Sequence, residues 1–326
     1  AGWGSGLAPH RKSIKPHPAT FDTRSPALFR SIAASFAALG LAFALPACAQ
    51  PAPPVAATPA DPALWVVKDK DTTIYLFGTI HVLKPGLSWF DDAVRKAFDK
   101  SGTLVLEMVE PDQATQQKVV LSKAFAPDGP TLSEQLPPAK RAAFATALTE
   151  NGLSLSQYDR MRPWFAAISL SILPLEKIGY DPANGPEGIL TRAAKAQKKQ
   201  VMGLETFEGQ MSIFDKLSQK GQIELLSSTI DELPKARENM DKMVADWASG
   251  RPEALAAEMN ASLKDTPEVA ETLLLNRNKQ WAGWIAERMK TPGTVFIAVG
   301  AGHLAGKGSV QDQLLRYKLK AVRIKY

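Results

Sequence analysis

The chain has 326 residues, of which 45% are hydrophobic, 8% aromatic and 22% charged, values typical of a globular protein with a sizeable core. Its formal net charge of +6 does not indicate a nucleic-acid-binding protein. Much of the excess falls in residues 1–50, and no dense Lys/Arg cluster follows them. We therefore expect no nucleic-acid partner.

The N-terminal segment has the pattern of a secretory leader. Arg24 and Arg30 precede an apolar, alanine-rich run over residues 31–45, which is too short to predict a membrane span. We interpret residues 1–49 as a leader whose signal peptide covers about 24–49. The first 20 or so residues are expected to precede the natural start. The protein is then exported, and the periplasm is its expected location.

The single cysteine, Cys48, directly follows this apolar run. Residues 45–48 resemble a lipobox, in which Cys48 would be lipidated and would anchor the protein to the envelope. Residues 47–49 also fit a small-residue cleavage site, after which no cysteine would remain. Both interpretations stay open. In neither would the mature protein have a disulfide, and a lipid on Cys48 is the one membrane contact that we expect.

Residues 50–63 are rich in proline and alanine and are expected to form an extended tether. One domain is predicted over residues 64–326. It opens with a hairpin of strands 64–67 and 73–77, and residues 112–290 are mostly helical apart from a short strand at 200–202. The other predicted elements are helix 90–99 with a capping box from Ser88, strand 103–106, helices 138–150, 163–173, 186–196 and 221–247, strand 294–299, helix 309–317 and strand 321–324.

The two ends of this domain repeat one pattern. A strand leads into Gly78-Thr-Ile-His81, a loop, a helix and a second strand, and near the C-terminus a strand leads into Gly300-Ala-Gly-His303 and the same succession. Such units predict an α/β fold with a mixed β-sheet and a large helical middle section. Ligands in these folds bind where strands end and loops begin.

His81 and His303 are the only histidines after the leader. A lone histidine is more often structural, but two in the same motif after an apolar strand favour a shared site. Glycine suits the sharp bend of the backbone, and an imidazole at a strand end can bind a metal or move a proton.

Glu107 and Glu205 each follow an apolar strand, where a carboxylate is costly unless it is paired or functional. The alternatives are a salt bridge for Glu107 and a cap of the helix near Phe207 for Glu205. Two histidines and two glutamates suit a divalent-metal hydrolase, and they suit metal-free acid–base hydrolysis equally well.

Several motifs resemble the TraB/PrgY/GumN family. They are Leu76-Phe-Gly-Thr-Ile-His81, Leu104-Val-Leu-Glu107, Gly203-Leu-Glu-Thr206, Arg277-Asn278 with Trp281, and Val299-Gly-Ala-Gly-His-Leu304 followed by Gly306. That family is similar to the Tiki proteases, for which a divalent-metal peptidase mechanism is inferred.

The resemblance implies that His81, Glu107, Glu205 and His303 are the catalytic residues, with His81, His303 and Glu107 as the candidate ligands of a divalent metal ion. It implies a substrate-binding role for Arg277, whose alternative is a helix-face salt bridge, and Arg162 is a second candidate for this role.

These patterns predict an exported, peptidase-like hydrolase acting on a peptide or a related small amide or ester. The alternative is a non-catalytic binding or regulatory protein of the cell envelope, which senses a peptide or takes part in polysaccharide export. The sequence predicts neither the particular substrate nor the oligomeric state.

Overall fold

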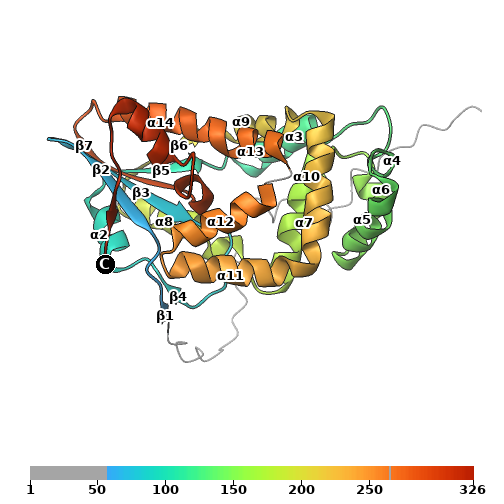
Figure 1. Ribbon diagram of the computed structural model, residues 1–326, viewed down its shortest axis with the longest axis horizontal. Helices are drawn as coiled ribbons and strands as arrows, with labels where there is room; N and C mark the ends of the chain where they lie inside the picture. Colours follow the sequence, from blue (N-terminus) through green and yellow to red (C-terminus); the bar gives the residue numbers. More distant parts are fainter. Residues whose placement is uncertain (1–56, 264–265) are drawn as a thin grey trace, which may run out of the picture.

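A computed structural model describes residues 57–263 and 266–326 (Figure 1). The leader, its apolar run and Cys48 lie outside the described residues. No helix in the described ranges is both long and apolar enough to cross a membrane. The fold joins a six-stranded sheet to a large helical lobe, which confirms the predicted α/β class.

The sheet has the strand order β6-β5-β7-β3-β2-β8. Its first four strands are parallel, whereas β2 and β8 are antiparallel to their neighbours. The predicted hairpin is therefore confirmed as β2 with β3. The bounds are β2 Leu64–Lys68, β3 Thr72–Thr79, β5 Thr103–Met108, β6 Gln200–Glu205, β7 Gly293–Gly300 and β8 Val322–Ile324.

The two strands that lead into the Gly-x-x-His segments lie side by side at the centre of the sheet. β3 and β7 pair in parallel, and their register places Thr79 opposite Gly300. Both strands therefore end at the same edge, although 221 positions separate these two residues along the chain.

Helices cover both faces of the sheet, which explains why its parallel strands are apolar along their length. On one face the core includes Trp281 and Ile285 of α14 (Asn276–Arg288), with α15 (Val310–Leu314) beside them. On the other face Phe77 and Phe296 pack with Trp247. The helices that contribute there are α2 Asp92–Lys100, α8 Pro186–Ala196, α11 Ala236–Ala248 and α12 Pro252–Leu263.

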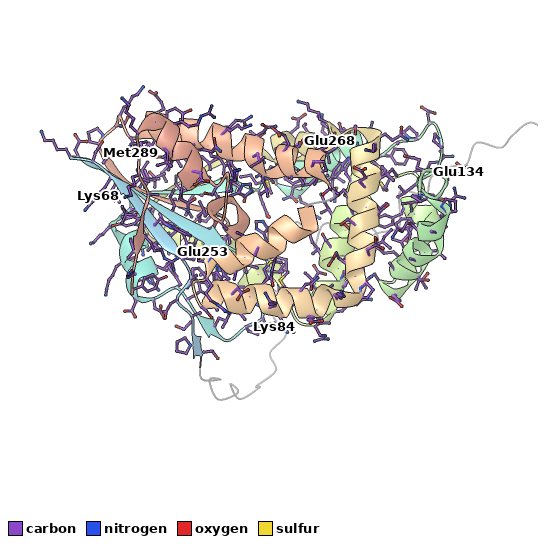
Figure 2. The ribbon with its side chains drawn as sticks, in the orientation of Figure 1. Lys68, Lys84, Glu134, Glu253, Glu268 and Met289 are labelled. Atoms are coloured by element: carbon purple, nitrogen blue, oxygen red, sulfur yellow. The ribbon has the colours of Figure 1, made fainter. Side chains whose placement is uncertain are left out.

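The middle of the chain forms a helical lobe with its own core around Trp164 and Phe165. Figure 2 shows Glu134 in this lobe, at the opposite end of the molecule from Lys68 and Met289. The helices of this part are α3 Gln113–Ala124, α4 Leu132–Gln135, α5 Pro138–Glu150, α6 Leu155–Tyr158, α7 Pro163–Lys177, α9 Phe207–Asp215, α10 Gln219–Glu232 and α13 Pro267–Ala270.

Several predicted helices have different bounds in the structure. The helix expected at 163–173 continues to Lys177, and two others differ more. The helix expected at 221–247 is broken by a 3₁₀ turn at Leu233–Lys235, because Pro234 lacks an N–H and clashes with the preceding turn. The helix expected at 90–99 begins at Asp92, since Leu87–Ser88 forms a short strand, β4, and Ser88 donates instead to the Asp91 carboxylate (2.5 Å).

The second half of the predicted tether packs against the domain. Thr58–Pro59 forms β1, which pairs in parallel with β4. Ala60 is buried, and the Asp61 N–H donates to the Ala248 carbonyl (2.7 Å). The small side chains of Ala60 and Ala63, which suggested a loose segment, are buried here, next to the ends of β4 and α11.

Candidate functional site

His81 and His303 meet at the common edge of β3 and β7. His81 follows β3 by two residues, and His303 lies in a 3₁₀ turn, Ala301–Leu304, directly after β7. A Cβ placed on Gly300 would lie 3.1 Å from Glu107 Oε1, 3.6 Å from His303 Cδ2 and 3.8 Å from His81 Nε2. Three of the four predicted catalytic residues therefore converge on one point, which a glycine leaves open.

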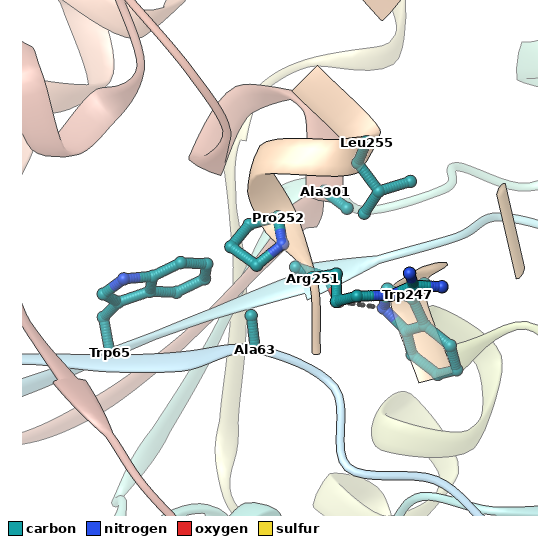
Figure 3. Close-up of a pocket in the computed structure, with 8 residues that line it drawn as sticks. Ala63, Trp65, Trp247, Arg251, Pro252, Leu255 and Ala301 are labelled. Atoms are coloured by element: carbon teal, nitrogen blue, oxygen red, sulfur yellow. Dashed lines mark hydrogen bonds between the residues drawn. The ribbon is translucent and has the colours of Figure 1, made fainter. Parts of the chain in front are cut away.

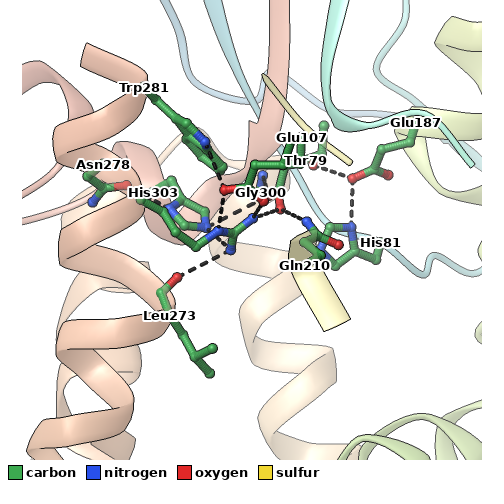
Figure 4. A network of polar contacts seen from close by, with 12 residues as sticks. Thr79, His81, Glu107, Glu187, Gln210, Leu273, Asn278, Trp281, Gly300 and His303 are labelled. Carbon is green, nitrogen blue, oxygen red and sulfur yellow. Dashed lines mark hydrogen bonds and ion pairs between the residues drawn. The ribbon is translucent and has the colours of Figure 1, made fainter. Parts of the chain in front are cut away.

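Arg277, at the start of α14, contacts Glu107, Glu205 and His303. Figure 4 shows Glu107 and His303 of this cluster together with His81. The Arg277 Nε and one terminal nitrogen form a two-pronged ion pair with Glu205, both at 2.9 Å. The same terminal nitrogen donates to Glu107 Oε2 at 2.5 Å. The other one lies 3.2 Å from the Leu273 carbonyl oxygen and 3.1 Å from His303 Nε2. These contacts employ all five N–H donors of the guanidinium.

The two carboxylates are held by further donors. Glu107 Oε1 accepts the Gly300 N–H (2.7 Å), and its Oε2 accepts from Gln210 of α9 (3.0 Å). Burial opposes ionisation of Glu107, but His303, Arg277 and the Gly300 N–H outweigh it and lower the pKa to about 2. Glu205 Oε1 accepts from the Trp281 indole (3.0 Å). Both carboxylates are thus paired, and the cap of α9 is Thr206 rather than Glu205.

His303 is a buried and neutral imidazole. Its Nδ1 donates to Asn278 Oδ1 (2.6 Å), and the Asn278 amide group donates to the Gly308 carbonyl, which fixes the orientation of the amide. Nε2 therefore carries the lone pair. The Trp281 ring packs on the imidazole at 4.3 Å between centroids. Burial lowers the pKa of His303 to about 4, against the attraction of Glu107.

His81 has the opposite electrostatic environment. Its Nδ1 lies 2.7 Å from Glu187 Oε1, an oxygen that also accepts the Thr79 hydroxyl at 2.5 Å. The Glu187 charge raises the pKa of His81 to about 9, although 68% of the side chain is exposed to solvent. At neutral pH one histidine of the pair is charged and the other is not.

The structure changes the interpretation of both arginines. All five donors of Arg277 are taken by the protein itself, so this residue organises the cluster and has no free donor for a substrate. Arg162 precedes α7, and its guanidinium pairs with Asp215 at the end of α9 (3.3 Å), not with the four predicted catalytic residues. The sequence could not show either arrangement, because each depends on a partner far along the chain.

The side chains present do not fit a divalent metal ion in this arrangement. Both oxygens of Glu205 and both of Glu107 accept N–H groups, and an Arg277 N–H faces the His303 lone pair. Within the described ranges, no three His, Cys, Asp or Glu side chains are placed to hold a metal. The cation at the centre of the cluster is Arg277.

Sequence reasoning missed three residues that hold the cluster together. Glu187 and Gln210 come from helices whose positions relative to the sheet no local pattern reveals. Asn278 stands beside Arg277 in the quoted motif and could have been proposed as a site residue, and the structure makes it the partner of His303. Another carboxylate, Glu110, is influenced by the charge of Glu187. Partial burial and this negative charge raise the pKa of Glu110 to about 6.

A separate recess lies beside the cluster (Figure 3). Trp65, Trp247, Pro252 and Leu255 line it together with Arg251, and Gly78 and Ala301 form part of its wall. The Trp247 indole donates to the Gly78 carbonyl (2.7 Å). None of the four predicted catalytic side chains lines this recess.

The fold and the cluster define an α/β protein whose polar site is built by two Gly-x-x-His segments at neighbouring strand ends. The model of the TraB/PrgY/gumN family matches residues 63–321, so the chain belongs to this family. It is 26% identical over 257 residues to the uncharacterized protein YbaP of Escherichia coli (strain K12), covering 78% of this chain and 92% of that protein.

An uncharacterized protein of Treponema pallidum (strain Nichols) is 22% identical over 274 residues, which covers 78% of this chain and 80% of the relative. No solved structure matches the chain. The relatives thus place the protein in a family without assigning a reaction.

Replacing Arg277 should lower the free energy of unfolding more than replacing a surface arginine does. Arg277→Met would leave two buried carboxylates without their cation, and we expect a loss of about 3–5 kcal/mol in the free energy of unfolding. Arg277→Lys should recover little, because one ammonium cannot reproduce the planar fork. Urea unfolding measures both, with the exposed Arg316→Met as the control. A loss below 1 kcal/mol, the usual range of surface ion pairs, would show that the cluster does not depend on Arg277.

Proposed function

We propose that this protein is a hydrolase that cleaves a peptide or a related amide or ester after export to the periplasm. One observation carries the proposal. One charged imidazole, one neutral imidazole and a buried carboxylate, from three distant segments, converge beside Gly300. Paired groups whose environments separate their pKa values are the usual arrangement of an acid and a base in one site.

His303 is the proposed general base. The Asn278 contact fixes the Nδ1–H tautomer, so the Nε2 lone pair is available to take a proton from water. In the structure this lone pair faces an Arg277 N–H. A water molecule must replace that contact, and the developing negative charge then lies next to the guanidinium. Glu107 keeps Arg277 in place and adds negative charge beside the imidazolium that forms.

His81 is the proposed general acid. Its charged ring lies beside the same point, and its exposure lets it reach a substrate that enters from solvent. It would give its proton to the departing amine or alcohol as the bond breaks. No step of this mechanism requires a metal ion, and the metal-dependent form would require Arg277 to leave both carboxylates.

Removal of either histidine should abolish turnover. We expect His81→Ala and His303→Ala each to lower kcat/KM by about 100-fold or more. The double variant should have a kcat/KM no lower than that of the less active single variant, because groups that act as a unit lose their effect together. The measurement is cleavage of a peptide library by the purified domain, read by mass spectrometry, with a thermal melt and a metal analysis of each variant.

Full activity in either single variant would contradict the shared site. Normal folding of the wild type with no cleavage of any peptide, amide or ester would favour the non-catalytic binding protein. A bound metal in the wild type that both single variants lose would favour the metal-dependent hydrolase.

The rate should depend on pH through both histidines. The base must be neutral, so kcat/KM should rise as pH increases through about 4, the pKa of His303. The acid must be protonated, so kcat/KM should fall as pH increases through about 9, the pKa of His81. The measurement is kcat/KM against pH on the best library peptide. An acidic limb near 6.5, the ordinary histidine value, would mean that the base does not have the lowered pKa of the buried His303, and persistence of the limb in His303→Ala would mean that His303 is not the base.

Export should leave a defined N-terminus on the native protein. If the leader is cleaved as the sequence predicts, the mature chain begins at a lipidated Cys48 or at Gln50. Mass spectrometry of the protein isolated from envelope and periplasmic fractions measures this. Retention of residues 24–47 would rule out export through this leader.

A further inference from the structure

The N-terminus of α8 is docked directly on the loop that carries His81. A Cβ on Gly185, the residue before α8, would lie 2.3 Å from the His81 carbonyl oxygen. Only glycine permits this approach without moving one of the two backbones. Pro186 then begins the helix, and Glu187 follows in its first turn, where the helix dipole favours a carboxylate.

Glu187 contacts the Gly-x-x-His segment twice with a single oxygen. Oε1 accepts the hydroxyl of Thr79 (2.5 Å) and lies 2.7 Å from His81 Nδ1. Thr79 is buried at the end of β3, whereas His81 is exposed, so the buried contact fixes the carboxylate that orients the exposed ring. The Glu187 side chain itself is 26% exposed.

We propose that Glu187 is a positioning residue for His81, whose carboxylate holds Nδ1–H so that Nε2 is presented to the point shared with Glu107 and His303. This inference rests on the hydrolase proposed above, because it assigns the orientation of the proposed acid. Figure 4 shows Glu187 and His81 on the opposite side of the cluster from Asn278 and Trp281.

Both histidines are then held through Nδ1, but by different side chains. Asn278 holds His303 by Nδ1, and Glu187 holds His81 by Nδ1. Both rings therefore use Nε2 for chemistry. An amide leaves its histidine neutral, whereas a carboxylate stabilises the charged ring. The Glu187 carboxylate beside His81 and the burial of His303 next to Asn278 thus separate the acid from the base.

The saturation of Arg277 strengthens this assignment. Since its five N–H donors are bound within the cluster, contact with a departing group falls to His81. The charged groups that face His81 are Glu187, Glu107 and Arg277. Of these, Glu187 alone forms a hydrogen bond with the His81 ring among the described residues.

The test compares Glu187→Ala, Glu187→Gln and the control Glu208→Ala, a first-turn glutamate of α9 that is exposed. Nitrogen-15 NMR of the histidine rings at neutral pH reports the tautomer and charge of His81 without any substrate. We expect Glu187→Ala to replace the signature of a doubly protonated His81 ring by that of a neutral ring with mixed tautomers, and to lower kcat by about 10- to 100-fold with KM little changed. Glu187→Gln should restore a single Nδ1–H tautomer and part of kcat, because the amide oxygen still accepts a hydrogen bond.

Thr79→Val is the second variant in case Glu187→Ala does not fold. It removes only the buried donor to Glu187 and should produce a smaller change of the same kind. Unchanged His81 ring signals in Glu187→Ala, or changed signals with unchanged kcat, would overturn the positioning role. If the wild type cleaves no library peptide but the ring signals respond as expected, the positioning role stands and the hydrolase does not.

Discussion

The ion pairs between Arg277 and the glutamates of two adjacent strands are the contact on which the site depends. Glu107 belongs to β5 and Glu205 to β6, and the guanidinium from α14 bridges them in a largely buried position. Two carboxylates this close would repel one another in a medium of low dielectric constant without a cation between them. Arg277 therefore ties α14 to the sheet edge, and Asn278 and Trp281 on the same helix reach His303 as a consequence.

This arrangement separates the roles of two groups that look equivalent in the chain. Both histidines occupy a Gly-x-x-His segment after a central strand, yet one is buried against Trp281 and the other lies in solvent beside a carboxylate. The buried ring loses its charge and the exposed ring keeps it. The site is asymmetric because a different helix packs on each of the two similar segments, α14 at His303 and α8 at His81.

Membership of the TraB/PrgY/gumN family agrees with this architecture, since the matched region spans the sheet, the helical lobe and both Gly-x-x-His segments. In the sequence, 87 residues separate the end of β6 at Glu205 from the start of β7 at Gly293, and they are helical over most of their length. α14 at its end supplies Arg277, Asn278 and Trp281 to the site, and α9 of the helical lobe supplies Gln210. The rest of the lobe packs around its own core at Trp164.

The sequence by itself determined the fold class and the pairing of the two central strands, and it singled out four residues that the structure places in one cluster, His81, Glu107, Glu205 and His303. Periodicity and glycine placement are local properties, and the repeated motif implied that the two strands end together. It could not determine the role of Arg277, the break at Pro234 or the contribution of Glu187. These depend on which helix docks against which strand end, and that choice is made by the packing of apolar faces over the whole domain rather than by any local pattern. The tertiary structure alone decided which histidine is charged, because only burial and neighbouring carboxylates separate two otherwise matching imidazoles.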